Sequence, residues 1–131
     1  MATWEGLRSY IKSKYAVAED QFEFLMLGFS MDDGRTQKVI VRRLRLGSDE
    51  WAEIASPVCP VGSIDPLEAL RSNGQVVVGG LALADWDENL IVFRHSLPIK
   101  DLDLDEFEVP FQIVISLADR FEQQFTGADT Y

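Results

Sequence analysis

The sequence predicts an α+β fold, with the element order αβββαββα and a largely antiparallel five-stranded sheet that carries the N- and C-terminal helices on one face. Three observations predict this fold. Apolar residues recur every three or four positions from Leu104 to Phe125, which is typical of a long helix. Three apolar segments in the first half are separated by Asp-Gly and Gly-Ser-Asp turns, which indicates an antiparallel meander. A helix-start signature at Asp65-Pro66 precedes two further apolar segments.

The first half is expected to hold one helix and three strands. Thr3 is suited to cap a helix in which Trp4, Leu7 and Ile11 share a face and which ends near Tyr15. Aromatic and β-branched residues then favour strands, with hairpin turns between them. These strands span residues 21–29, 36–46 and 51–58, and the turns are Asp32-Asp33-Gly34 and Gly47-Ser48-Asp49.

The second half is expected to begin with a short helix. Asp65 is the N-cap, Pro66 takes the first helical position, and Glu68 is placed to reach back to the cap. The helix should stop at Asn73-Gly74, where Gly74 can adopt the left-handed conformation of a C-cap. Two strands follow at residues 75–84 and 90–97, with a turn between them.

The final helix carries a proline inside its apolar pattern. Pro110 would remove one hydrogen bond and clash with the preceding turn, at a cost of roughly 3 kcal/mol. We therefore expect a break there, with an acidic turn before a helix that begins near Pro110. Beyond it, the apolar stripe should lie on the sheet, while Asp119 and Glu122 face water. Ile113 and Leu117 lie off the stripe, so they should contact the first helix or form a partner surface.

The charge of the chain is unevenly distributed. The 131 residues carry a net charge of −10, and residues 51–131, with four basic and fourteen acidic side chains, hold the whole surplus. Binding to phosphates requires clustered Lys and Arg, so nucleic acid and anionic membranes are poor partners for this chain. The length suits a single domain over residues 1–131, and the acidity suits a basic or neutral partner.

Cys59 is the only cysteine, so no intramolecular disulfide is possible. No charged leader followed by an apolar run opens the sequence, and no apolar stretch approaches the length of a membrane span. These features predict a cytoplasmic protein.

No motif in the sequence supports a metal, cofactor or phosphate site. The run Asp101, Asp103 and Asp105 resembles the start of a calcium loop, but Glu106 stands where its glycine should be and Gln112 where its bidentate glutamate should be. The acidic run is instead expected to stabilise the N-terminal end of a helix. The glycines at 74, 79 and 80 lack the Gly-Lys-Ser/Thr of a phosphate loop, and strand packing explains them better.

Catalysis has equally little support. His95 is the only histidine and is expected to be partly exposed on a strand, while Cys59 between Val58 and Pro60 is typical of a small buried hydrophobe. The Arg42, Arg43 and Arg45 cluster suggests an anion patch, but cross-strand pairs with Glu23 or Glu53 would explain it as well.

Several short features together resemble a known group of proteins. They are the opening helix Trp4 to Tyr15, Ala55-Ser56-Pro57-Val58, Asn73-Gly74, the Trp86 turn followed by Val92 to Pro98, and Ala118 to Glu122. In this arrangement the chain resembles the YbjN-type family of bacterial sensory-transduction regulators and the related type III secretion chaperone-like fold. The resemblance implies a small acidic cytoplasmic α+β protein that often forms homodimers and holds another protein. It implies no catalytic residues.

Two hypotheses of function follow, with a small hydrolase as a third that would depend on His95. The first is a non-enzymatic, chaperone-like module without cofactor or metal, which holds a partner segment on exposed apolar surface. Its candidate partner-binding residues are Phe22, Phe24, Met26 and Trp51, which would otherwise be ordinary core. Its candidate homodimer interface comprises Leu67, Leu70, Val76 and Val78. The second hypothesis is a small-molecule or signal-sensing regulatory domain with a pocket between sheet and helices.

Overall fold

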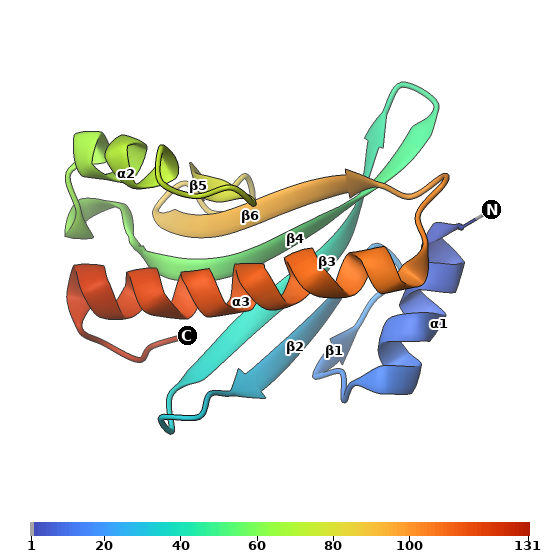
Figure 1. Cartoon of the computed structure of the whole chain (residues 1–131), viewed down its shortest axis with the longest axis horizontal. Coiled ribbons are helices and arrows are strands. Elements are labelled where there is room, and N and C mark those ends of the chain that lie inside the picture. The colour runs from blue at the N-terminus through green and yellow to red at the C-terminus, as the bar shows by residue number, and fades with distance from the viewer. Residues whose placement is uncertain (1) are drawn as a thin grey trace.

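The computed structural model describes residues 2–131 and contains one antiparallel sheet with helices packed against it (Figure 1). In chain order its elements are α1 (Trp4–Lys14), β1 (Glu19–Asp20), β2 (Phe24–Ser30), β3 (Thr36–Leu46), β4 (Asp49–Pro60), the 3-10 helix η1 (Val61–Ser63), α2 (Pro66–Asn73), β5 (Gly80–Leu83), β6 (Leu90–Pro98) and α3 (Leu104–Thr126). The predicted α+β class is confirmed.

The sheet has six strands in the order β1-β2-β3-β4-β6-β5, and every neighbouring pair is antiparallel. The additional strand is β1, whose two residues pair with Leu25 and Met26 of β2. Two residues are too few to show an apolar alternation, so the sequence did not reveal this strand. Between β4 and β5 the chain passes through η1 and α2, and β5 then forms the far edge of the sheet.

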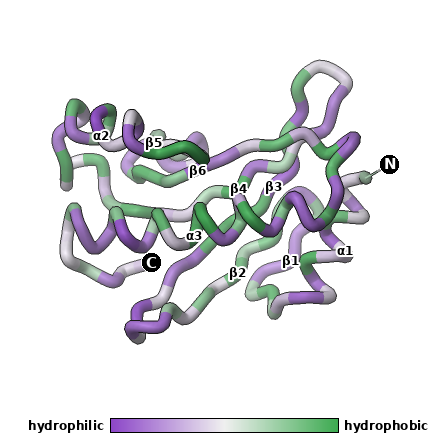
Figure 2. The backbone as a smooth tube through the Cα atoms, in the orientation of Figure 1, coloured by the Kyte–Doolittle hydropathy of each residue, from purple (hydrophilic) through white to green (hydrophobic). Residues whose placement is uncertain are grey.

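One face of the sheet carries the hydrophobic core. Along β3, Val39 and Val41 are fully buried on this face. Ile40 between them points to the other face, because side chains alternate along a strand. α3 lies across β3, β4 and β6 with its apolar stripe toward them, and its backbone alternates between hydrophobic and hydrophilic residues (Figure 2). The buried part of the stripe consists of Phe107, Phe111, Val114, Ile115, Ala118 and Phe121.

α1 is joined to the first turns of α3 by a polar node. The hydroxyls of Tyr10 and Tyr15 donate to the two carboxylate oxygens of Glu108 at 2.7 and 2.6 Å, and Lys14 Nζ lies 3.0 Å from the same group. These donors lower the pKa of Glu108, although burial acts in the opposite direction. The Trp4 indole donates to the Phe22 carbonyl at 2.7 Å and fixes the other end of α1.

The expected break at Pro110 is wrong, because α3 runs without interruption through this residue. Asp103 and Glu106 form a capping box at the start of the helix. Phe107 and Phe111, on either side of the proline, are fully buried and stack with their ring centroids 4.9 Å apart. Burial of two phenylalanines, at roughly 1.5–3 kcal/mol each, exceeds the cost of one interior proline.

Two further predictions about α3 concern the exposure of Ile113 and Leu117 and that of Asp119 and Glu122. Leu117 is half-buried and packs against the core, and Ile113 is also half-buried, so neither is an exposed apolar residue. Asp119 and Glu122 do not face water: they are 7% and 1% exposed.

The segment after α2 also differs from its prediction. α2 ends at Asn73 as expected, but Gly74 has φ −67° and is therefore not a left-handed cap. Residues 75–79 form no strand, and β5 begins only at Gly80. The left-handed residue is Gly79, with φ 76°, where a Cβ would lie 2.6 Å from Phe93 Cε1. This close approach requires glycine and turns the chain onto the sheet edge.

Replacing Pro110 should therefore stabilise the protein. Pro110→Ala restores a donor for the Glu106 carbonyl and removes the ring clash. The greater entropy of the unfolded chain offsets part of this gain, so we expect the free energy of unfolding to rise by about 1–2 kcal/mol. Thermal and urea unfolding would measure it as a rise in Tm of about 3–8 °C. Val109→Ala, an exposed change in the same turn, serves as the control. An unchanged or lower Tm for Pro110→Ala would show that α3 accommodates the proline without cost.

Candidate partner-binding surfaces

The outer face of the sheet, which lies opposite to α1 and α3, carries a strip of large apolar side chains. We call this strip the outer strip: Phe24 and Met26 of β2, Ile40 and Leu44 of β3, and Trp51 of β4. All five are half-buried and alternate with fully buried or helix-side residues along their strands. The outer face of this sheet therefore does not show the polar composition of a fully solvated sheet face.

Strand register places the members of the outer strip in adjacent pairs. Met26 lies opposite Ile40 across β2 and β3, and Leu44 lies opposite Trp51 across β3 and β4. Directly opposite residues on one face of an antiparallel sheet have Cβ atoms about 4.5–5.5 Å apart. Arg42 separates the two pairs on β3, and Phe24 lies opposite Arg42 on β2, so the strip extends over three strands with Arg42 inside it.

An ion-pair network adjoins the outer strip. Glu53 is 3% exposed and accepts from Arg42 and Arg94, each at 2.7 Å. Arg42 also binds Asp85 at 2.7 Å, and the ring of Trp86 lies 5.1 Å from its guanidinium carbon. Hydrogen bonding to Arg42 lowers the pKa of Asp85. The expected cross-strand pairs are confirmed for two arginines of the cluster: Arg42 binds Glu53, and Arg43 lies 3.5 Å from Glu23. Arg45 is exposed and takes part in neither pair.

A second apolar surface lies between α2 and β5. A groove of about 340 Å³ is lined there by Val61, Ala69, Leu70, Leu81 and Leu83 together with a few other, mainly apolar residues. Leu70 is 67% exposed and Leu83 is 61% exposed. The groove is therefore a second place where exposed apolar side chains are grouped.

The structure brings together three of the four predicted partner-binding residues. Phe24, Met26 and Trp51 share the outer strip. Phe22 lies before β2, 55% exposed, with the guanidinium carbons of Arg8 and Arg43 at 5.9 and 5.5 Å from its ring centroid. Phe22 therefore belongs to a separate position beside α1.

The four predicted dimer residues lie on α2 and on the segment after it. Leu67 and Leu70 are 51% and 67% exposed on α2, and Leu70 lines the α2–β5 groove. Val76 and Val78 are half-buried in the segment before β5, where Val76 packs against the core. Only the two leucines thus offer large exposed surface.

The residues considered for catalysis lie in unreactive surroundings. Cys59 is fully buried, and burial raises the pKa of its thiol, so the thiolate is disfavoured. His95 is half-buried on β6, and burial and neighbouring Arg94 lower its pKa. Both positions agree with the structural roles expected from the sequence.

A buried charge cluster at the end of α3 was missed by sequence analysis. Arg35 Nε donates to Asp119 at 2.9 Å, and its terminal nitrogen lies 3.6 Å from Glu122. The other oxygen of Glu122 accepts from the Thr130 amide at 2.7 Å, so the C-terminal residues fold back over the helix. Burial raises the pKa of Glu122. The available signal was the three-residue spacing of Asp119 and Glu122, which places both on one helix face.

This cluster also has the spacing of a metal site. Carboxylate oxygens of Asp119, Glu122 and Asp129 lie within 4.8 Å of one another. Arg35 already supplies positive charge to Asp119 and Glu122, and Asp129 accepts from the Thr36 amide at 3.1 Å. The cluster is therefore explained as an internal ion pair that fixes the C-terminal residues.

Comparison with known proteins supports the fold. No family model matches the chain, and a search of curated proteins finds no match. Among solved structures, a chain of the HopA1–SchA chaperone–effector complex matches with a TM-score of 0.61 and 12% sequence identity, over 89% of this chain and 90% of that chain. The two chains share a fold. None of the helices in residues 2–131 is long and apolar enough to cross a membrane.

Removing the positive charge of the buried cluster should destabilise the protein in a pH-dependent way. Arg35→Met keeps an unbranched stem but leaves Asp119 and Glu122 buried without their counter-ion, so the free energy of unfolding at pH 7 should fall by about 3 kcal/mol. Burial already raises the pKa of Glu122 in the folded protein, and the loss of Arg35 should raise the pKa of this carboxyl further above its unfolded value. The loss of unfolding free energy is then fully present at a pH above the folded-state pKa, and it disappears as the pH falls to the pKa of the unfolded chain.

Urea unfolding at pH 7 and at pH 4 would measure this difference. Arg45→Met, an exposed change on β3, the strand that Arg35 immediately precedes, should be nearly neutral at both pH values. An equal loss for Arg35→Met at both pH values would show that packing of the stem, rather than charge, accounts for the effect.

Proposed function

We propose that the protein is a non-enzymatic, chaperone-like binding module that holds an extended segment of a partner protein. The outer strip carries this proposal. It presents five half-buried apolar side chains on a sheet face opposite to α1 and α3, in a fold shared with a chain of a chaperone–effector complex. A partner segment would cover these side chains and remove them from water.

An extended segment suits the outer strip better than a helix. Phe24 and Met26 occupy alternate positions of β2, with Ile40 and Leu44 on the neighbouring strand, so alternate side chains of an extended chain would meet successive apolar positions. Arg42 lies within the strip, between Ile40 and Leu44, and is paired with Glu53 and Asp85, so a partner segment would meet a neutralised guanidinium group among the apolar side chains.

The core favours this function over small-molecule sensing. A sensing domain needs a cavity with convergent polar groups between sheet and helices. Phe93, Phe107, Phe111 and Val114 are fully buried in that interface, and the cavity beside the start of α3 lies at the end of the sheet rather than within the core. The apolar groove lies instead at the α2–β5 edge.

We further propose that the protein is a homodimer through α2. Leu67 and Leu70 are three positions apart on one helix and each is at least half exposed. In a two-fold interface both protomers contribute each leucine, so a short helix supplies a substantial apolar area. We also assign the chain to the YbjN-like group in a bacterial cytoplasm, on the sequence features described above and the single free cysteine.

Charges introduced into the outer strip should abolish partner capture. The full chain would be used as bait in an extract of its native cells, with mass spectrometry of bound proteins and metabolites. We expect Met26→Glu combined with Leu44→Glu to retain less than about a tenth of a protein that the unmodified chain captures, since an unpaired charge would be buried in the interface.

Val109→Glu, on an exposed position of α3, is the matched control and should capture normally. Circular dichroism and thermal unfolding would establish that both variants are folded. Undiminished capture by the double variant, or recovery of a small ligand without protein, would contradict the proposal.

The dimer is tested separately by light scattering after size exclusion. We expect a dimer at micromolar concentration and a monomer for Leu70→Asp, with dissociation at least about a hundredfold easier, because two leucine contacts are lost per dimer. Val109→Asp should remain dimeric. A monomeric unmodified chain at micromolar concentration would refute this part of the proposal.

A further inference from the structure

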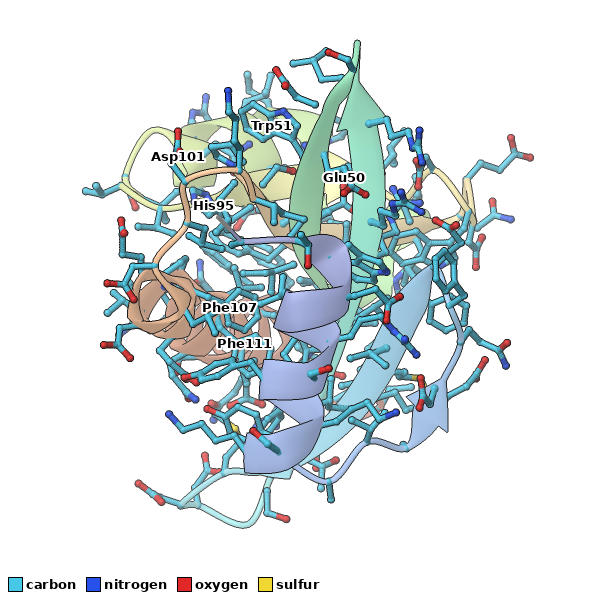
Figure 3. The ribbon with its side chains drawn as sticks, turned by 90° about the vertical axis from the view of Figure 1, so that its right-hand side faces the viewer. Glu50, Trp51, His95, Asp101, Phe107 and Phe111 are labelled. Carbon is cyan, nitrogen blue, oxygen red and sulfur yellow. The ribbon has the colours of Figure 1, made fainter. Side chains whose placement is uncertain are left out.

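A cavity of about 390 Å³ lies at the end of the sheet, beside the start of α3. Figure 3 shows Trp51, His95 and Asp101 grouped at this end, near Phe107 and Phe111 of the helix. Four parts of the chain build it: the start of β4, the end of β6, the connection from β6 into α3, and the first turns of α3. None of the functions discussed above uses this cavity.

The cavity borders an unpaired strand edge. β5 pairs with β6 from Ile91 to Arg94 only. Within the described residues, positions 95–98 therefore have β4 on one side and no strand on the other. A segment that lies along this edge would place its side chains at the cavity.

The walls of the cavity are apolar and aromatic. Trp51, Leu97 and Pro98 contribute from the sheet, and Leu102 and Pro110 from the connection and α3. Such walls accommodate an aliphatic stem, and the face of a tryptophan attracts a cation placed over it.

The charged groups of the cavity are predominantly negative. Asp49, Glu50, Asp101 and Glu106 oppose one ammonium group, that of Lys100. Glu50 binds Arg43, and Glu106 accepts from the Asp103 amide. Asp49 and Asp101 are exposed and make no side-chain hydrogen bond or ion pair within residues 2–131. The lowered pKa of His95 keeps its ring neutral at pH 7, so the ring does not repel a cation.

We propose that this cavity binds a basic side chain, lysine or arginine, which the partner segment carries at the free edge of β6. The aliphatic stem would pack on Trp51, and the ammonium or guanidinium group would meet Asp49 and Asp101. The combination explains why two unpaired carboxylates adjoin an apolar wall. The inference rests on the proposed protein-binding function and specifies one chemical feature of the partner.

A side-chain probe tests the cavity without knowledge of the partner. Nα-acetyl-lysine methylamide would be titrated into the ¹⁵N-labelled full chain while the three indole N–H signals are followed by NMR. The Trp51 signal should shift in a saturable way, whereas Trp4, bonded to Phe22, and Trp86, packed on Arg42, should not. The uncharged norleucine analogue should bind at least about fivefold more weakly, because it lacks the ammonium group.

Variants assign the effect to the carboxylates. Asp49→Asn combined with Asp101→Asn should weaken lysine binding about three- to tenfold, in the range of two exposed ion pairs. Asp32→Asn combined with Glu68→Gln removes the same charge at remote exposed positions and should leave the affinity within about 1.5-fold. Equal binding of the lysine and norleucine probes, or an unchanged affinity in the Asp49/Asp101 variant, would overturn the inference.

The outcome is separable from that of the proposed function. Partner capture that survives in the Asp49/Asp101 variant but is lost in the Met26/Leu44 variant would overturn the cavity inference alone. Saturable lysine binding without any captured partner protein would support the cavity and count against the chaperone-like function.

Discussion

The structure depends on the burial of one apolar stripe of α3 against one face of the sheet. Phe107, Phe111 and Val114 are fully buried, and Phe121 stacks on Phe93 with ring centroids 5.7 Å apart. A single long helix, with α1 beside it, is enough to cover this face, so the fold has two layers. The opposite face of the sheet has no second layer of helices, and its apolar residues need another solution.

The apolar residues of the outer face are covered to different extents in two parts of that face. Toward β6, Arg42 and Arg94 lie over Glu53 and shield neighbouring residues, so that Ala55 and Val92 are almost fully buried without a helix above them. Arg42 also lies between Ile40 and Leu44 on β3, yet these two residues and Met26 remain half-buried. The half-buried apolar residues of the outer face are therefore grouped on β2, β3 and the start of β4.

Local signals in the sequence predicted local structure well. Thr3, Asp65 and Asp103 each lie at a helix start and accept from a backbone amide, and the hairpin glycines at 34 and 47 have positive φ. The failures came from contacts between distant segments. Pro110 stays inside a helix because Phe107 and Phe111 are buried on the sheet, and Asp119 and Glu122 are buried because Arg35, some 84 residues earlier, pairs with Asp119. The strand register was needed to tell which apolar residues lie on the outer face. Phe22, predicted to lie in a strand, lies instead in the bend before β2.

The acidic residues near the start of α3 differ in their roles, and two of them lie beside both the cavity and the outer strip. Charge at the start of α3 has a local role, because Asp103 and Glu106 cap the helix and Glu108 anchors α1. Asp49 and Asp101 have no such role, and they flank the free edge of β6 beside Trp51. Trp51 is also a member of the outer strip, so one residue borders both the apolar strip and the acidic cavity. An extended segment could therefore place apolar side chains on the strip and a basic side chain in the cavity, which is a more selective requirement than apolar contact alone.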